Sequence, residues 1–316
     1  LESGQSYGGV SGGCLEADVR EIARASWDDD VPRLCHYDTG DDPGTVWGLG
    51  LGCNGSVDVF VQPATPRSSD DWSRVGNLLA GDRRFAVATV IAESPEGGRC
   101  LIHTGEGISG TTGDEQVDEY LAGIAGDCVA TGRSVYRAIG LVPVFCEVYE
   151  PPPRLVIFGA GDDAIPLSAM GTTVGFRVSV VDHRPAFINK DRFPDALSLI
   201  DRRPDDGLDG LLLHADSYAV VMTHALDHDA AWLRQLLDSE VGYIGVLGPQ
   251  PRTDRILAEI GWESDQRIYG PVGLDIAADG PEQIALSILS ELLAVRGGRE
   301  AAHLRNRAGS IHSVQT

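Results

Sequence analysis

The chain has 316 residues, a formal net charge of −22 at pH 7, and 42% hydrophobic and 23% charged residues. This length and composition allow two globular domains with sizeable cores, and the acidic excess argues against nucleic acid or an anionic membrane surface as a partner, because their phosphates would be repelled. No run of about 18 apolar residues occurs, so no membrane-spanning helix is expected, and we interpret the protein as cytoplasmic.

The first half of the chain, residues 1–150, predicts an α+β domain. Leu15, Val19 and Ile22 repeat at helical spacing and indicate a helix near the start. The alternating valines at 57–61 indicate a strand. The further predicted elements are a helix through 78–79, a strand at 85–91, a turn at 94–98 with a returning strand at 99–103, a helix at 115–131 and a strand at 142–148.

Three consecutive prolines, Pro151 to Pro153, separate the halves, because they form a stiff spacer without amide donors. Beyond them, continuous apolar strands alternate with amphipathic helices, which indicates a parallel sheet covered on both faces. We therefore predict a Rossmann-type α/β domain at 151–298 and a polar tail at 299–316. Its predicted strands fall at 155–158, 177–181, 219–222 and 243–247, and its helices around 165–170, 230–237, 252–260 and 281–295.

The charged residues are unusual in kind. Aspartates stand in adjacent groups in predicted loops, and Lys190 is the only lysine among 25 basic side chains. Such an acid excess suits a protein dissolved in concentrated salt, where screening removes most of the self-repulsion. We therefore hypothesise a halophilic host.

The back half contains a candidate nucleotide loop. Residues 159–164 form a G-x-G-x-x-A pattern between an apolar strand and a helix, which is the context that a dinucleotide-binding loop requires. Gly159 permits the turn, and the backbone of Ala160 and Gly161 can approach a pyrophosphate. The N-terminus of the helix supplies partial positive charge and free N–H groups.

Four charged residues qualify this interpretation. Asp182 ends the second strand, where a carboxylate can accept hydrogen bonds from ribose hydroxyls. Asp182 favours NAD over NADP for this reason. Arg184 could accept the 2′-phosphate of NADP, so NADP is not excluded. Asp162 and Asp163 place negative charge where phosphates would bind, although acidic residues also suit a bare helix N-terminus. A Rossmann domain that has lost its nucleotide is the alternative.

Six cysteines are present, at irregular spacings and without a C-x-x-C pair, which excludes a zinc framework and a disulfide-stapled small domain. Four of them are interpreted as small buried apolar residues in a reducing compartment. They are Cys35, Cys100, Cys128 and Cys146.

The other two cysteines lie in glycine-rich loops. Gly12 and Gly13 precede Cys14 at the start of the first predicted helix, where the positive helix end favours the thiolate. Gly52 precedes Cys53, and glycine beside a cysteine lets a ligand approach the sulfur closely. Tight structural turns that contain a cysteine are the alternative for each loop.

Several motifs occur in one order along the chain. They are Gly9 to Glu16, Trp47 to Cys53, Val181 to Pro185, Arg192 to Ala196, Tyr243 to Gly245, Gly270 to Ile276 and Pro281 to Ala285. Together with the Rossmann half, these motifs resemble the xanthine dehydrogenase accessory (XdhC/CoxI) family. The resemblance covers Gly8 to about Val61, and Arg154 to Arg296.

The resemblance implies a maturation factor for molybdenum hydroxylases such as xanthine or carbon monoxide dehydrogenase. Such a factor would bind the molybdenum cofactor (molybdopterin), assist its sulfuration and pass it to the apo-enzyme. The implied partners are the apo molybdenum hydroxylase and a cysteine desulfurase. Carried over by motif, Cys14 and Cys53 would face the cofactor or handle sulfur, and soft thiolates suit both roles. We also expect a homodimer.

Two further segments follow strands of the Rossmann half, at the carboxyl edge of the sheet, where ligands bind. His224 and His228 are four residues apart and could bind a metal together with a neighbouring aspartate. Because a third spaced ligand group is lacking, substrate or nucleotide contact is favoured and no metal is predicted. Gly248 begins a loop that could place Arg252 near an anion, although a simple turn explains it equally well. A rival function is that of an NAD(P)-dependent oxidoreductase acting on a small metabolite, with His224 as acid/base.

Overall fold

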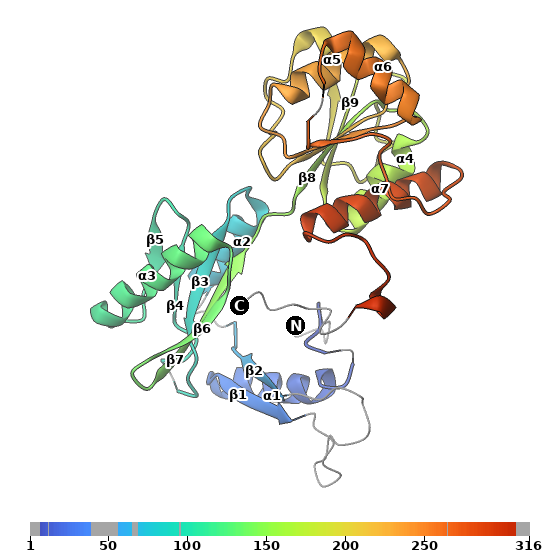
Figure 1. Cartoon of the computed structure of the whole chain (residues 1–316). Coiled ribbons are helices and arrows are strands. Elements are labelled where there is room, and N and C mark those ends of the chain that lie inside the picture. Colours follow the sequence, from blue (N-terminus) through green and yellow to red (C-terminus); the bar gives the residue numbers. More distant parts are fainter. Residues whose placement is uncertain are drawn as a thin grey trace. The chain divides into compact units, whose positions relative to one another are not determined.

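The structure is a computed structural model of the chain, and it describes residues 7–11, 13–38, 56–64, 69–94, 96–263 and 265–307. The chain forms two compact units, Leu1–Pro151 and Pro152–Thr316 (Figure 1). Within the described ranges, no helix is long and apolar enough to cross a membrane.

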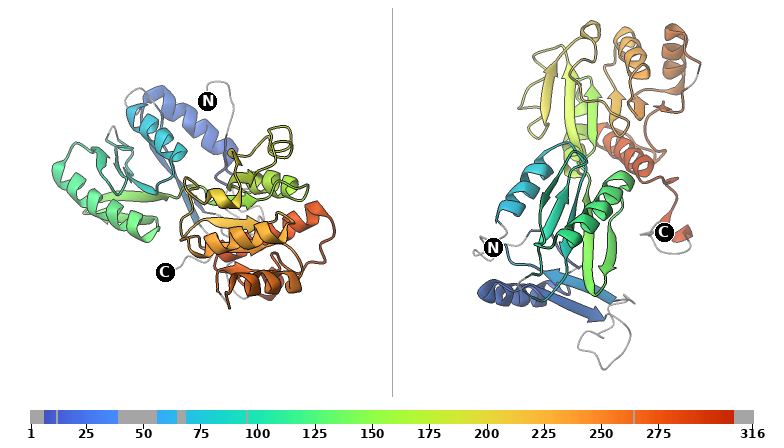
Figure 2. Two further views of the ribbon diagram at one scale, coloured as in Figure 1. Left: turned by 90° about the horizontal axis from the view of Figure 1, so that it is seen from above. Right: turned by 90° about the vertical axis from the view of Figure 1, so that its left-hand side faces the viewer.

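The first unit contains a five-stranded antiparallel sheet with the strand order β5-β4-β3-β7-β6. Figure 2 shows this sheet between helices α2 and α3 in its right-hand view. The elements are α2 (Ser69–Ala80), β3 (Phe85–Val90), β4 (Cys100–His103), β5 (Ile108–Gly110), α3 (Glu115–Thr131), β6 (Val135–Ile139) and β7 (Val142–Tyr149).

Strand β3 is buried on both faces because a helix covers each of them. Ala86 and Ala88 pack on the side of α3, whereas Phe85 and Val87 pack on the side of α2. This alternation follows the two-residue period of a strand. Helix α3 begins where Asp114 accepts hydrogen bonds from two backbone amides of its first turn and ends at a left-handed glycine, so its limits match the predicted 115–131.

The beginning of the first unit forms one helix and a separate two-stranded sheet. Helix α1 (Glu16–Asp29) is followed by β1 (Arg33–Asp38), which pairs antiparallel with β2 (Ser56–Val61). The hydroxyl of Tyr37 donates a 2.6 Å hydrogen bond to Asp18, joining β1 to α1. Strand β1 was not predicted from the sequence.

The second unit is a six-stranded, all-parallel sheet with the order β10-β9-β8-β11-β12-β13. Helices α4 and α7 pack on one face and α5 and α6 on the other. These helices confirm the predicted α/β fold class with its Rossmann-type sheet. The elements are β8 (Arg154–Phe158), α4 (Ala164–Thr173), β9 (Arg177–Asp182), β10 (Ser198–Asp201), β11 (Tyr218–Val221), α5 (Leu226–Leu237), β12 (Tyr243–Val246), α6 (Gln250–Ile260), β13 (Ile268–Tyr269) and α7 (Pro281–Arg296).

The strand order sets the place where a ligand can enter. From β8 the chain moves outward through β9 to β10, and then returns to β11 on the other side of β8. The connections after β8 and β11 therefore run in opposite directions and leave a crevice at the carboxyl ends of these strands, which is the general ligand site of open α/β sheets. The glycine loop after β8 lies at this point.

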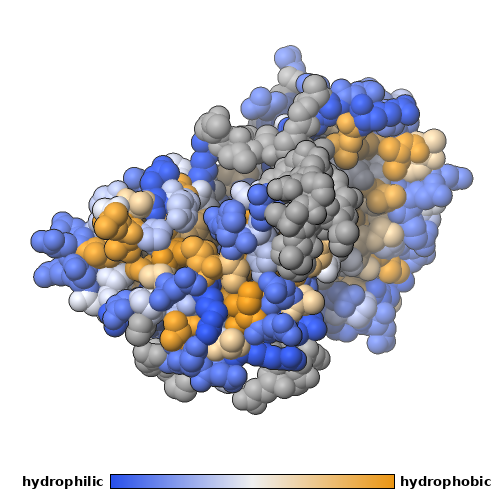
Figure 3. Space-filling view, turned by 90° about the horizontal axis from the view of Figure 1, so that it is seen from below, coloured by the Kyte–Doolittle hydropathy of each residue, from blue (hydrophilic) through white to orange (hydrophobic). Residues whose placement is uncertain are grey.

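The surface combines charged and apolar side chains. Figure 3 shows apolar side chains, in orange, among hydrophilic ones on one face of the molecule. Among the described residues, Leu141 is 99% exposed and Tyr136 60% exposed, both in the β6–β7 hairpin. Scattered exposed apolar side chains are ordinary on globular proteins, so these two residues do not by themselves mark a docking site.

Candidate functional site

The glycine loop is held between β9 and β11 at the carboxyl end of the central strand β8. Gly159 has a φ of +117°, and a Cβ atom there would lie 2.5 Å from the carbonyl oxygen of Met222, at the end of β11. Its amide donates a 2.8 Å hydrogen bond to the carbonyl of Val181 on β9. Only glycine therefore allows the loop to approach β11 this closely.

Asp182 braces the same loop from the end of β9. Its Oδ2 accepts hydrogen bonds from the Ala160 amide at 2.7 Å and from Nη2 of Arg184 at 2.8 Å, while its Oδ1 accepts from the amide and Nε of Arg184 at 2.9 and 3.0 Å. A carboxylate offers about four acceptor sites, so these bonds occupy all of them. A ribose hydroxyl could bind Asp182 only after Arg184 moves.

The charge of Asp182 is stabilised by these contacts. Burial raises the pKa of its carboxyl, but the hydrogen bonds from Arg184 and Ala160 outweigh burial and lower this pKa to about 2. Asp182 is 6% exposed, so its carboxylate is largely shielded from solvent. The contact with ribose that the sequence predicts stays a prediction.

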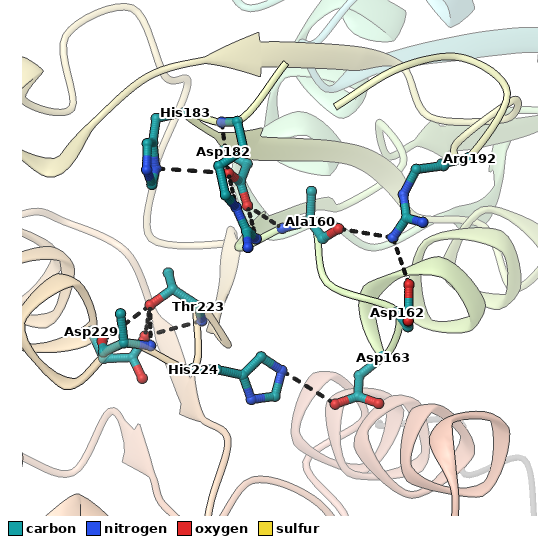
Figure 4. Close-up of polar contacts among 11 residues, drawn as sticks. Ala160, Asp162, Asp163, Asp182, His183, Arg192, Thr223, His224 and Asp229 are labelled. Atoms are coloured by element: carbon teal, nitrogen blue, oxygen red, sulfur yellow. Dashed lines mark hydrogen bonds and ion pairs between the residues drawn. The ribbon is translucent and has the colours of Figure 1, made fainter. Parts of the chain in front are cut away.

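Each of the two acidic residues of the loop contacts a basic side chain (Figure 4). Asp162 accepts a 2.9 Å contact from Arg192, which also donates to the Ala160 carbonyl at 3.1 Å. Asp163 lies 3.3 Å from Nε2 of His224. Because both pairs are partly exposed, they contribute little to stability, but the guanidinium of Arg192 offsets negative charge at the loop.

His224 stands in an unusual backbone conformation in the loop after β11. Its φ is +63°, a value that non-glycine residues rarely adopt. The preceding Thr223 donates its amide and hydroxyl to Asp229 at 3.0 and 2.5 Å, and the buried Asp229 also accepts from Arg252 at 2.6 Å. These bonds hold the loop in place from helices α5 and α6.

Gly248 lies against a side chain of this network. It has a φ of +128°, and a Cβ atom there would lie 2.5 Å from Cδ of Arg252. The glycine thus makes room for Arg252, which binds Asp229. In the structure Arg252 serves an internal carboxylate, while contact of Gly248 with a cofactor stays a prediction.

A pocket of about 210 Å³ opens beside Asp182, at the ends of β9, β10 and β11 and the start of α5. An adjacent cavity of about 390 Å³ shares His183 and His228 with it. The rings of these two histidines meet edge to face at 5.0 Å. The smaller pocket is lined by Val181, Asp182, His183, Arg184, Arg202, Thr223, Ala225, His228 and Trp232.

Sequence reasoning did not select His183 and Arg202, which line this pocket. Arg202 follows β10, a strand that was not predicted, so its place at the carboxyl edge was not apparent. The position of His183 directly after Asp182, a predicted site residue, was the sequence feature that could have indicated it. Within the described residues, no group of three His, Cys, Asp or Glu side chains is placed to hold a metal ion.

Cys14 lies exposed just before α1, in a loop organised by Ser11. The Ser11 hydroxyl accepts hydrogen bonds from the amides of Gly13, Cys14 and Leu15 at 3.3, 3.0 and 3.0 Å, and donates to Glu16 at 2.6 Å. Hydrogen bonds from the Ser11 hydroxyl and amide lower the pKa of Glu16 to about 2. The predicted site residues Gly12, Gly52 and Cys53 lie outside the described residues.

Three of the four cysteines that the sequence predicts to be buried have that position in the structure. Cys100, Cys128 and Cys146 are buried, and Cys35 is half-buried. Burial raises the pKa of the Cys100 thiol to about 12, so this thiol stays protonated at neutral pH.

Comparisons with known proteins bear on both units. A family model described as the XdhC Rossmann domain matches residues 155–292, and one described as the XdhC and CoxI family matches residues 1–38. A Bacillus subtilis protein, named as a probable subunit of xanthine dehydrogenase, is 32% identical over 295 residues, which cover 93% of this chain and 86% of that protein.

Two further similarities extend this result. The crystal structure of a xanthine dehydrogenase from Bacillus halodurans superposes with a TM-score of 0.80 at 32% identity, covering 96% of this chain and 87% of that one. The Escherichia coli molybdenum cofactor insertion chaperone PaoD is 26% identical over 153 residues, which cover 47% of this chain and 42% of PaoD. The matches span both units, and the chain therefore belongs to the XdhC and CoxI family.

Proposed function

We propose that this protein is an accessory factor for a molybdenum hydroxylase, and that it binds the molybdenum cofactor and assists its sulfuration and insertion. The names of its relatives support the first part, because one is named as a probable part of xanthine dehydrogenase and another as a molybdenum cofactor insertion chaperone. The apo hydroxylase and a cysteine desulfurase are the partners that this function requires.

The observation that carries the proposal is the setting of Cys14. Its thiol is exposed, and the amides of its loop are tied to Ser11, so the sulfur stands on an ordered backbone at the start of α1. A soft sulfur ligand suits molybdenum, and a thiol can also take part in sulfur exchange. Cys14 lies in the segment that matches the family model.

The Rossmann unit supports binding of a phosphate-bearing ligand. No acceptor among the described residues binds the amides of Gly161, Asp162 and Asp163, so these amides are available at the positive end of α4. When bound, the cofactor would supply the molybdenum and its terminal sulfur. Gly159 and Gly161 would let its phosphate, or the pyrophosphate of an NAD(P) molecule, approach the backbone.

The test is the cofactor content of the purified protein. Co-purified molybdenum and the fluorescence of the oxidised pterin should be present in the wild type and fall at least about tenfold in Cys14→Ala, because a metal or sulfur contact is lost. Cys35→Ala is the matched control and should keep its cofactor. Equal cofactor content in the Cys14 and Cys35 variants would contradict the proposal.

A second candidate is an NAD(P)-dependent oxidoreductase. The exposed imidazole of His224 lies 3.3 Å from the Asp163 carboxylate beside the glycine loop, an arrangement that can orient a general acid or base. This function predicts that the protein steadily reduces NAD(P) with a small metabolite as the hydride donor. The activity should be lost in His224→Asn and unaffected in Cys14→Ala.

A further inference from the structure

We propose that the pocket of about 210 Å³ between the ends of β9, β10 and β11 and the start of α5 binds a phosphomonoester, the doubly charged phosphate at one end of a small-molecule ligand. This inference rests on the proposed function in one respect, since the phosphate belongs to the cofactor that the Rossmann unit holds. The pocket would then distinguish a phosphorylated ligand from one that ends in free ribose hydroxyls.

The charge of the pocket lining supports this assignment. Two arginines line it with a single carboxylate, that of Asp182, and two histidines add polar ring nitrogens. The whole chain carries a net charge of −22, so a basic lining is a local reversal of the general charge. A concave basic site of this kind attracts anions. Asp205 and Asp227 line the adjacent cavity and limit the basic region on that side.

Asp182 cannot serve as the usual acceptor for ribose in this arrangement. Its four acceptor sites are occupied by Ala160 and Arg184, and the guanidinium of Arg184 offsets its charge. An incoming ligand therefore meets hydrogen-bond donors at this position rather than a free carboxylate. The same carboxylate binds the glycine loop, so the loop and the pocket are joined through one side chain.

Arg184 is held ready to bind an anion. It contacts Asp182 through Nε and Nη2, and its guanidinium lies 4.1 Å from the centre of the Phe187 ring. A guanidinium has five N–H donors, so Nη1 and the second N–H of Nη2 are left for a ligand. Because its plane is fixed by stacking and by the salt bridge, little side-chain freedom is lost on binding.

Arg202 supplies a second positive charge. Its Nη1 donates to the carbonyl oxygens of Gly207 and Asp209 at 3.2 and 2.6 Å, and its backbone amide donates to the Asp182 carbonyl. Within the described part of the chain, Arg202 makes no ion pair with a carboxylate. Arg202 is partly buried, and its charge is anchored by neutral groups and available to an anion.

The size of the pocket suits one group of a ligand. Pockets that enclose whole drug-sized ligands measure roughly 300–1,000 Å³, and this one is smaller. Trp232 and Val181 form apolar walls, and the imidazoles of His183 and His228 add ring N–H groups. Two ligands carry the matching group next to a Rossmann loop: a dinucleotide with a 2′-phosphate, and a pterin cofactor that ends in a phosphate.

The experiment is a calorimetric titration of the full chain with 2′-AMP and with adenosine, in the wild type, in Arg202→Met and in Arg234→Met. Arg234 is an exposed arginine on α5 outside the pocket lining, so its variant is the matched control. If the pocket binds the phosphate of a nucleotide, 2′-AMP binds more tightly than adenosine. Arg202→Met then weakens 2′-AMP binding at least about tenfold, because a charged hydrogen bond is lost, and the control binds as the wild type does.

A different result is expected in the same proteins if the bound phosphate is that of the pterin cofactor. In that case 2′-AMP does not bind, and the pterin content of purified Arg202→Met falls while that of Arg234→Met does not. Inorganic phosphate should compete with whichever ligand binds the wild type, a measurement that needs no variant to fold. The inference is overturned if neither 2′-AMP binding nor pterin content depends on Arg202. The proposed function is tested separately, by whether Cys14→Ala loses the cofactor that the wild type holds.

Discussion

Asp182 joins three parts of the Rossmann unit through one carboxylate. It holds the Ala160 amide of the glycine loop, the side chain of Arg184 and, through its backbone carbonyl, the amide of Arg202. An acidic residue at the end of β9 is predictable from the sequence pattern. Its use as an internal brace is not, because it depends on the rotamer of Arg184 and the direction of one amide.

The brace predicts a pH dependence of stability. The pKa of Asp182 is about 2 in the folded chain against an ordinary value of 3.8. A lowered folded pKa means that the carboxylate stabilises the fold fully above about pH 4 and that this contribution is lost as the pH falls towards 2. We expect Asp182→Asn to unfold at lower urea than the wild type at pH 6, with a difference of about 1–3 kcal/mol that shrinks at pH 3.

The exposed Asp195→Asn is the control for this measurement. It should unfold with the wild type at both pH values, because its carboxyl is in solvent. A difference between Asp182→Asn and the wild type that stays constant from pH 6 to pH 3 would refute the brace.

At the scale of elements, the β8–α4 connection is determined by how closely it approaches β11. The sequence pattern predicted this connection because apolar strand, glycine loop and helix follow one another directly. It did not predict β10 and β13, which are four and two residues long. Both lie at the edges of the sheet, where partial burial leaves no continuous apolar run to detect.

A pair of glycine variants tests the close approach. Gly159 and Gly175 both have positive φ values, +117° and +93°, but a Cβ atom would meet Met222 at the first and nothing within 4 Å at the second. Gly175→Ala should therefore cost only backbone strain, about 1 kcal/mol. Gly159→Ala should cost roughly 1–3 kcal/mol more, because the methyl group overpacks the loop. Urea unfolding measures both, and equal losses would show that the loop can move away from β11.

At the scale of the whole molecule, charge is the dominant feature. The chain has 47 acidic and 25 basic side chains, and unscreened repulsion between like charges opposes the compact state. The halophilic origin stays a hypothesis based on this balance.

Salt should therefore stabilise the protein. We expect the melting temperature to rise from dilute buffer to molar KCl, by about 2–4 °C for each kcal/mol gained in a unit of this size, since the Debye length falls to about 3 Å at 1 M salt. Sodium chloride is the control and should act equally if screening is the cause. A melting temperature that is flat or falls with salt would exclude the hypothesis.

The sequence by itself determined the α/β class, the glycine loop and the family, because these depend on local patterns: apolar runs, helical periodicity, and motifs of neighbouring residues. The tertiary structure alone decided how the site residues are used. Asp162 meets Arg192, Asp163 meets His224, and Asp182 meets Ala160 across 22 positions. Such contacts join strand ends that are distant in the chain, so no local pattern records them. For the same reason the basic pocket around Arg202 became apparent only when β10 took its place beside β9.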